Sequence, residues 1–162
     1  MQSRLLVTAA VVAALLTAAC GSSAQSTASA SPSVPTSPSP AAAGATIAVA
    51  SNAKLGQILV DGAGKTLYLF VADTGSSSTC DTACAQLWPP VLTSGPAQAG
   101  TGAAASLLGT TTRTDGKTEV TYGGHPLYYF VSDKQAGDAT GQGVDSFGAL
   151  WWVVSPSGAA IH

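Results

Sequence analysis

The chain has 162 residues, with eight acidic and six basic side chains, a net charge of −2 and no run of Lys or Arg. Nucleic-acid binding depends on clustered basic residues that face phosphates, so this composition leaves no basis for it. All ten aromatic residues lie between Tyr68 and Trp152, so the hydrophobic core must form in that part of the chain.

A signal peptide is predicted over residues 1–19. Arg4 supplies one positive charge, and residues 5–19 form an uncharged run that ends in small side chains. This run is shorter than the roughly 20 residues that span a bilayer as a helix, and no cluster of positive charge follows it. We therefore expect it to be removed on export and not retained as a membrane anchor.

The sequence around Cys20, Leu16-Thr17-Ala18-Ala19-Cys20-Gly21, resembles the lipobox of bacterial lipoproteins. In that motif the cysteine is acylated before the leader is cleaved on its N-terminal side, and an aliphatic residue usually stands where this chain has Thr17. The resemblance implies an extracytoplasmic protein anchored to the cell membrane by lipid on Cys20. The alternative is a secreted protein in which Cys20 is an unpaired, reactive thiol.

Residues 20–44 are predicted to be a tether, because after Cys20 they are almost entirely Ala, Ser, Pro, Thr and Gly. Such a segment cannot bury enough apolar surface to offset the entropy lost on ordering. Its reach runs from about 27 Å as a flexible coil to about 75 Å if its prolines hold it extended. One globular domain is expected over residues 45–162.

The globular part contains an internal repeat. Residues 64–73 align with residues 124–133 at an offset of 60, and six of the ten positions are identical. Further on, Leu87 and Trp88 match Leu150 and Trp151 at an offset of 63. We therefore expect two copies of one unit, over about residues 46–105 and 106–162, that bury their repeated strands against one another.

A mainly β fold is predicted from short runs of β-branched and aromatic residues that are separated by Gly, Asp or Pro. The expected strands are 58–60, 67–72, 119–122, 127–132 and 151–154. Residues 61–64 and 123–124 are expected to form hairpin turns, which makes the sheet antiparallel. A short helical turn is expected at Ala83–Leu87, because the prolines at 89 and 90 would end it.

Neither face of the two repeated strands is polar, so we expect both strands to be covered on both sides. The aromatic residues of the two copies share one face, and aliphatic residues share the other. The first face carries Tyr68, Phe70, Tyr128 and Phe130, and the second carries Leu67, Val71, Leu127 and Val131.

The repeat carries two copies of a Tyr-x-Phe-x-x-Asp motif, at Tyr68, Phe70 and Asp73 and again at Tyr128, Phe130 and Asp133. Three further segments, each present once, accompany the two motifs: Cys80-x-x-x-Cys84 before Trp88-Pro89-Pro90, Arg113-x-Asp115-Gly116 and Gly141-Gln142-Gly143. Together they resemble the secreted-repeat bacterial lipoproteins defined by a Yx(FWY)xxD motif. The resemblance covers nearly all of the chain after the tether and implies a surface lipoprotein without an established biochemical activity.

The motif has two interpretations. Its rings and carboxylates could form a ligand platform, with stacked aromatic side chains and an acidic lip. We favour the alternative in which the rings are core and Asp73 and Asp133 accept backbone N–H bonds from the turns that follow, at 74–75 and after Lys134. Both copies need the same fold, so duplication of the motif favours this structural role.

Cys80 and Cys84 are the two thiols that remain once Cys20 is lipidated, and outside the cytoplasm a pair this close is expected to be oxidised. In an ideal helix, residues four apart hold their Cβ atoms about 5–6 Å apart, beyond the usual 3.5–4.5 Å of a disulfide. Cys80 is therefore expected in a turn outside the helix. A redox or soft-metal site is the alternative role for the same pair.

Other candidate chemistry is sparse. Residues 138–145 have the oxygen donors and glycines of a loose calcium loop, but they lack the alternating acidic ligands of an EF-hand. His125 and His162 are the only histidines, too few for a zinc hydrolase site, and no Gly-x-Ser-x-Gly elbow is present. We expect no catalytic residue, metal or cofactor. The predicted function is a non-enzymatic binding or envelope-associated module, and the alternative is extracytoplasmic redox or metal handling by Cys80 and Cys84.

Overall fold

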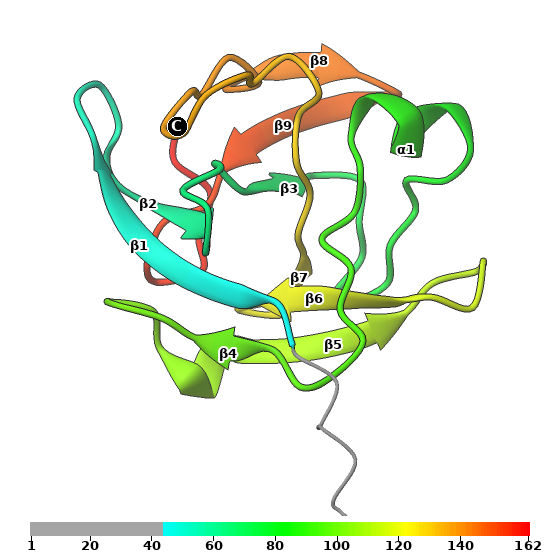
Figure 1. Cartoon of the computed structure of the whole chain (residues 1–162). Helices are drawn as coiled ribbons and strands as arrows, with labels where there is room; N and C mark the ends of the chain where they lie inside the picture. Colours follow the sequence, from blue (N-terminus) through cyan, green and yellow to red (C-terminus); the bar gives the residue numbers. More distant parts are fainter. Residues whose placement is uncertain (1–43) are drawn as a thin grey trace, which may run out of the picture. The chain divides into compact units, whose positions relative to one another are not determined.

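The computed structural model describes residues 44–162 (Figure 1), so the predictions for the signal peptide, for Cys20 and for nearly all of the tether lie outside the described residues. The described part is mainly β, as predicted. Its elements are β1 (Thr46–Asn52), β2 (Gly56–Asp61), β3 (Tyr68–Phe70), α1 (Ala83–Leu87), β4 (Gln98–Ala99), a 3-10 turn (Ala105–Leu107), β5 (Leu108–Thr112), β6 (Thr118–Tyr122), β7 (His125–Pro126), β8 (Val144–Ser146) and β9 (Ala149–Val153). Within residues 44–162, no helix is long and apolar enough to cross a membrane.

The strands form three small sheets, in the orders β2-β1-β4, β3-β9-β8 and β5-β6-β7. Every pairing is antiparallel except that of β1 with β4. The predicted hairpin turn at 123–124 joins β6 to β7, with both glycines at positive φ. In Figure 1, β3 of the first copy lies beside β9 of the second copy, and the two strands pair from Tyr68 opposite Val153 to Phe70 opposite Trp151. The copies therefore share a sheet.

The two copies meet at equivalent residues. The Tyr68 amide donates to the Tyr128 carbonyl at 2.9 Å, and the Tyr128 amide donates to the Tyr68 carbonyl at 3.0 Å. Equivalent flanking bonds run from Val154 to the carbonyl of Leu67 and from Val91 to the carbonyl of Leu127. The copies are thus related by a local twofold arrangement, and each supplies the strand that the other copy needs.

The predicted strand 127–132 is wrong as a continuous strand, since only an isolated bridge at Tyr128 follows β7. Its neighbour is the segment around Pro89 and Pro90, where the Tyr129 amide donates to the Pro89 carbonyl at 2.8 Å. Proline has no N–H to donate in return. The local twofold makes the pairing of this segment with residues 127–132 equivalent to the pairing of β3 with β9. β3 and β9 form a continuous ladder, whereas the prolines interrupt the equivalent pairing.

Two hydrophobic clusters lie on opposite faces of the repeated strands, as the alternation predicts. One cluster gathers Tyr68, Phe70, Trp88, Tyr128 and Trp151, with Phe130 partly buried against it, and the other gathers Leu67, Leu69, Val91, Tyr122 and Leu127. Val71 and Val131 were expected to be covered but are 54% and 37% exposed. The reason is that both lie in the turns that follow the repeated segments.

Four aromatic rings form a continuous stack inside the first cluster. Ring centroids lie 4.1 Å apart for Phe70 and Trp151, 4.0 Å for Trp151 and Trp88, and 4.2 Å for Trp88 and Phe130. Such pairs contribute about 0.5–1.5 kcal/mol each beyond their burial. Trp88 and Trp151 occupy the same position in the two copies, so the stack joins the copies through their side chains.

Candidate functional site

Each aspartate of the repeated motif accepts a hydrogen bond from the tyrosine of the other copy. The Tyr68 hydroxyl donates to Asp133 Oδ2 at 2.6 Å, and the Tyr128 hydroxyl donates to Asp73 Oδ2 at 2.7 Å. Both tyrosines are fully buried, and both aspartates are 8% exposed. Burial, followed by the hydrogen bond to Asp133, raises the pKa of Tyr68, so its hydroxyl remains a donor.

The second oxygen of each aspartate closes a loop. Asp73 Oδ1 accepts from both the amide and the hydroxyl of Thr79 at 2.7 Å, and Asp133 Oδ1 accepts from the amide and hydroxyl of Thr140 at 2.9 and 2.6 Å. For Asp73 the expected donors at 74–75 are wrong, because Thr79 lies six residues further on. For Asp133 the expectation of a backbone donor after Lys134 is confirmed, because the Thr140 amide supplies it. The motif rings and carboxylates are buried structural groups and do not form an open platform.

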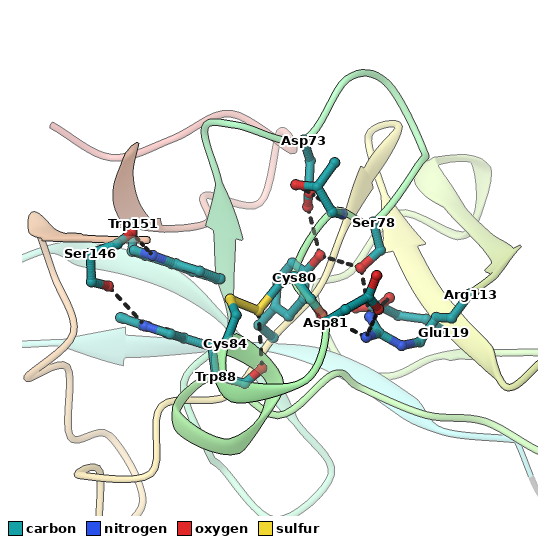
Figure 2. The surroundings of a disulfide bond; sticks show 12 residues. Asp73, Ser78, Cys80, Asp81, Cys84, Trp88, Arg113, Glu119, Ser146 and Trp151 are labelled. Carbon is teal, nitrogen blue, oxygen red and sulfur yellow. Dashed lines mark hydrogen bonds and ion pairs between the residues drawn. A yellow bond between two sulfur atoms is a disulfide. The ribbon is translucent and has the colours of Figure 1, made fainter. Parts of the chain in front are cut away.

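A disulfide joins Cys80 and Cys84, with a Cα–Cα distance of 5.2 Å (Figure 2). Cys84 lies in α1, whereas Cys80 precedes the helix, as predicted. The two residues are 0% and 6% exposed, and the Cys80 sulfur lies 3.9 Å from the carbonyl oxygen of Trp88. Between them, Thr82 has a φ of 47°, a strained conformation for a β-branched residue.

The disulfide lies beside the stacked indoles of Trp88 and Trp151, both of which bond to Ser146 (Figure 2). The Trp88 indole N–H donates to Ser146 Oγ at 3.2 Å, and the Trp151 indole N–H donates to the Ser146 carbonyl at 3.2 Å. Both buried indole donors are therefore satisfied, and this arrangement fixes the rings against which the disulfide packs.

A buried ion pair lies on the other side of the disulfide loop (Figure 2). Arg113 follows β5 and Glu119 lies in β6, and their Nη1 and Oε2 atoms are 2.8 Å apart with side chains 2% and 0% exposed. Arg113 also donates to Ser78 Oγ, to the Cys80 carbonyl at 2.6 Å and to Asp81 Oδ1 at 3.1 Å. The guanidinium thus binds the 78–81 loop to the β5–β6 hairpin.

Glu119 is the carboxylate whose ionisation is most affected by this environment. Burial raises its pKa to about 7, although the hydrogen bond and charge of Arg113 act in the opposite direction. Among residues 44–162, its Oε1 atom finds no hydrogen-bond partner. Burial alone would lower the pKa of Arg113, but the hydrogen bond to Glu119 and the charges of Glu119 and Asp81 act together in the opposite direction, so the pKa is raised and the guanidinium stays charged. The pair is therefore a buried contact whose strength depends on pH.

In the other half of the domain, the position equivalent to the Arg113–Glu119 ion pair is open. The amide-to-carbonyl bond from Leu59 to Val154 matches that from Val120 to Val91, which aligns the copies here at an offset of 61. At this offset Asn52 stands where the second copy has Arg113, and Ile58 stands where it has Glu119. One half is therefore closed by a buried ion pair that the other half lacks.

A cavity of about 610 Å³ lies beside Asn52, and we call it the interloop cavity. One wall is formed by residues 51–55 at the β1–β2 turn, and the other by residues 137–140 and Gln142. Asn52 binds the two walls together, since its side-chain amide donates to the Gly137 carbonyl at 3.0 Å. The volume falls within the range of about 300–1,000 Å³ that is typical of small-molecule sites.

The other candidate residues are not brought together. Asp138 accepts two backbone N–H bonds from the turn before it, and Asp145 lies exposed in β8. His125 is in β7, whereas the His162 ring packs against Trp152 at 4.7 Å. Within residues 44–162, no group of three His, Cys, Asp or Glu side chains could hold a metal ion.

Sequence reasoning missed the burial of Glu119. A glutamate at the start of a predicted strand is ordinarily expected at the surface. The available signal was its alignment with Ile58, a fully buried position of the first copy. Arg113 was noted only as part of a shared motif, and its role became visible once β5 and β6 paired and carried it beside Glu119.

A duplicated β domain whose copies exchange strands and carry one disulfide defines a class of small repeat protein. The chain belongs to the family described as a secreted repeat of unknown function, whose model matches residues 49–92 and 109–155, more than half of the chain and one match in each copy. The family resemblance expected from the motifs is confirmed, and it fits an extracytoplasmic module. No curated protein and no solved structure matches the chain.

Proposed function

We propose that this protein is a surface-exposed lipoprotein, acylated on Cys20 and held to the cell membrane, whose globular domain is a non-enzymatic binding module. Its export is supported by membership of the secreted-repeat family and by the leader and lipobox of the sequence. The reach expected from the composition of residues 20–44, about 27–75 Å, would separate the anchor from the domain by that distance. The ligand site is the interloop cavity.

The observation that carries the binding role is the difference between the two halves. Because the domain is duplicated, each half contains a junction at which a loop faces the turn of a β-hairpin. In one half Arg113 fills this junction, with bonds to Ser78, Cys80 and Asp81. In the other half the junction remains a cavity of about 610 Å³. A filled junction contributes only to the fold, whereas an open junction with fixed walls is able to take a ligand.

The walls of the cavity are held in place before any ligand arrives. Asn52 Oδ1 accepts the amides of Lys54 and Leu55 at 2.9 and 3.1 Å. On the opposite wall, Thr140 is bonded to Asp133, and Gln142 bonds both the Val153 amide and the Ile161 carbonyl. A preformed site loses less entropy on binding, which favours affinity.

The proposal is tested on the full-length protein, isotope-labelled and purified in detergent, by recording amide chemical shifts against a panel of amino acids, sugars and nucleosides. We expect one class of compound to shift the amides of residues 51–55 and 137–142 saturably. Ala53→Trp should weaken that binding, because the exposed Ala53 lines the cavity. Ala105→Trp, which is exposed elsewhere, is the control. A panel in which no compound shifts these amides would contradict the binding role.

The alternative, redox or metal handling by Cys80 and Cys84, has less support. Thiol–disulfide exchange needs an attacking thiolate to reach a sulfur atom, and these two residues are 0% and 6% exposed. A metal role would first require reduction of the bridge and then further ligands beside it. The binding proposal needs no such change in the protein.

A further inference from the structure

We propose that the interloop cavity binds a zwitterion, namely an amino acid or a short peptide with a free ammonium and a free carboxylate. This inference rests on the proposed binding function and names its ligand class. The two walls of the cavity carry one charge each and of opposite sign, Lys54 on the 51–55 wall and Asp138 on the 137–142 wall.

Lys54 is the one cation of residues 44–162 whose charged group has no partner there. Lys117 pairs with Asp115 at 3.1 Å, the Lys134 ammonium donates to the Val131 carbonyl at 2.6 Å, Lys65 lies over the ring of Tyr129, and Arg113 pairs with Glu119 at 2.8 Å. The backbone of Lys54 is nevertheless fixed, since its amide donates to Asn52 Oδ1. Lys54 therefore lines the cavity from a fixed backbone position, and its exposed side chain is available to a ligand carboxylate.

Asp138 is held in place on the opposite wall. Its Oδ2 atom accepts the backbone amides of Lys134 and Gln135, each at 2.9 Å, which fixes the orientation of the carboxylate. Within the described part of the chain, Oδ1 makes no hydrogen bond and the carboxylate makes no ion pair. Asp138 is also partly buried. Oδ1 is thus placed to accept a hydrogen bond from a ligand ammonium.

The two charges do not satisfy one another. Lys54 and Asp138 form no ion pair within 4 Å, although both line the same cavity, which is also lined by the small or apolar residues Ala53, Leu55 and Ala139. A ligand with a single charge can pair with only one of the two residues. A zwitterion with a small side chain pairs with both, and its apolar part contacts the alanines and the leucine.

The experiment titrates the full-length protein in detergent with three forms of one dipeptide: free Ala-Ala, N-acetyl-Ala-Ala and Ala-Ala amide. Binding is measured by calorimetry and by the shifts of cavity amides. We expect each blocked peptide to bind about fivefold more weakly than the free one, because each has lost one of two partly exposed charge contacts. Equal binding of all three forms would overturn the zwitterion proposal.

Two variants assign the contacts. Lys54→Gln should bind free Ala-Ala and its amide equally, while it still discriminates against the N-acetyl form. Asp138→Asn keeps an oxygen for the Lys134 and Gln135 amides and should lose only the discrimination against the N-acetyl form. Lys65→Gln and Asp145→Asn, which do not line the cavity, are the matched controls.

The failure of this inference can be told apart from failure of the proposed function. If the free dipeptide does not bind but an uncharged sugar or nucleoside shifts the amides of 51–55 and 137–142, the ligand class is wrong and the binding role stands. If no compound shifts these amides, the binding role itself is contradicted. Variants that bind all three peptide forms as the wild type does would show that Lys54 and Asp138 are not the contacts.

Discussion

Tyr68 and Tyr128, equivalent residues of the two copies, exchange both backbone hydrogen bonds, and each donates its hydroxyl to the aspartate of the other copy's motif. Within each copy of the motif, the tyrosine and the aspartate therefore do not bond to one another, and each finds its partner in the other copy. Removing one hydroxyl affects both copies, because it leaves a buried carboxylate oxygen of the partner copy without its donor.

Tyr68→Phe should accordingly lower the free energy of unfolding by about 1–3 kcal/mol, the cost of leaving Asp133 Oδ2 unpaired in the core. The control is Tyr129→Phe, whose hydroxyl makes a longer and only partly buried bond of 3.1 Å to Asp61. Denaturant unfolding of both variants measures the difference. An equal, small loss in both variants would show that the bond between the copies contributes little.

The sequence predicted most of what is local and repeated. The centres of β2, β3, β6 and β9, the helix Ala83–Leu87, the hairpin turns and the opposite faces of the repeated strands were expected. It did not predict β1, the longest strand, or the short β4. It also missed β5, whose Leu-Gly-Thr-Thr-Thr sequence has no continuous buried face, and β8, which contains an exposed Asp145. β5 and β8 are defined by their partners β6 and β9 and not by their own composition.

The candidate site was less predictable than the fold, because it depends on contacts across the two copies. The bond from Tyr68 to Asp133 spans 65 residues, and the contact of Arg113 with the Cys80 carbonyl spans 33. The interloop cavity results from a residue pair that one copy has and the other lacks. A search for catalytic motifs could not find such a difference, whereas an alignment of the copies at an offset of 61 points to it.

The Glu119 carboxyl should make the stability of the protein depend on pH. Its pKa is raised from the ordinary glutamate value of 4.5 to about 7 in the fold. Between these values the folded protein binds a proton that the unfolded chain has released, so the free energy of unfolding falls as the pH rises. The contribution is fully present below about pH 4.5 and is lost as the pH passes about 7, with a size of at most about 3 kcal/mol.

Glu119→Gln removes this titration, so the difference in unfolding free energy between wild type and variant isolates it from the other ionisable groups. We expect the wild type to lose stability relative to Glu119→Gln between about pH 5 and pH 7, as measured by urea unfolding at a series of pH values. Asp115→Asn, at the exposed end of the same hairpin, should not reproduce the effect. A constant difference across this range would mean that Arg113 keeps Glu119 ionised throughout.

Cys20→Ser should release the protein from the membrane or leave it as uncleaved precursor, because the proposed anchor is lipid on this residue. One acyl chain holds a protein only marginally, so the several chains expected from lipobox processing matter. Fractionation of cells, with mass spectrometry of the N-terminus, measures both outcomes. A correctly cleaved variant without lipid that stays in the membrane fraction would place the anchor elsewhere.

Removal of the Cys80–Cys84 disulfide tests whether its role is structural or redox. The chain-entropy model assigns so short a loop only about 2 kcal/mol, so Cys80→Ser/Cys84→Ser should lower the melting temperature without abolishing the fold. The second copy supports this expectation, because it forms the corresponding part of the domain without a cysteine. Arg113 also continues to hold this loop in the variant, since its bond to residue 80 is made with the backbone carbonyl.

Metal content and free thiols are measured on the exported wild-type protein alongside the melting temperature of the variant. A structural bridge predicts no free thiol at Cys80 and Cys84, no stoichiometric metal and a modest loss of stability. Two free thiols in the native protein, or copper bound in stoichiometric amount and lost in the variant, would contradict the structural role. Since Cu(I) binds as a soft ion to thiolates, that result would instead place a metal site beside Trp88 and the aromatic stack.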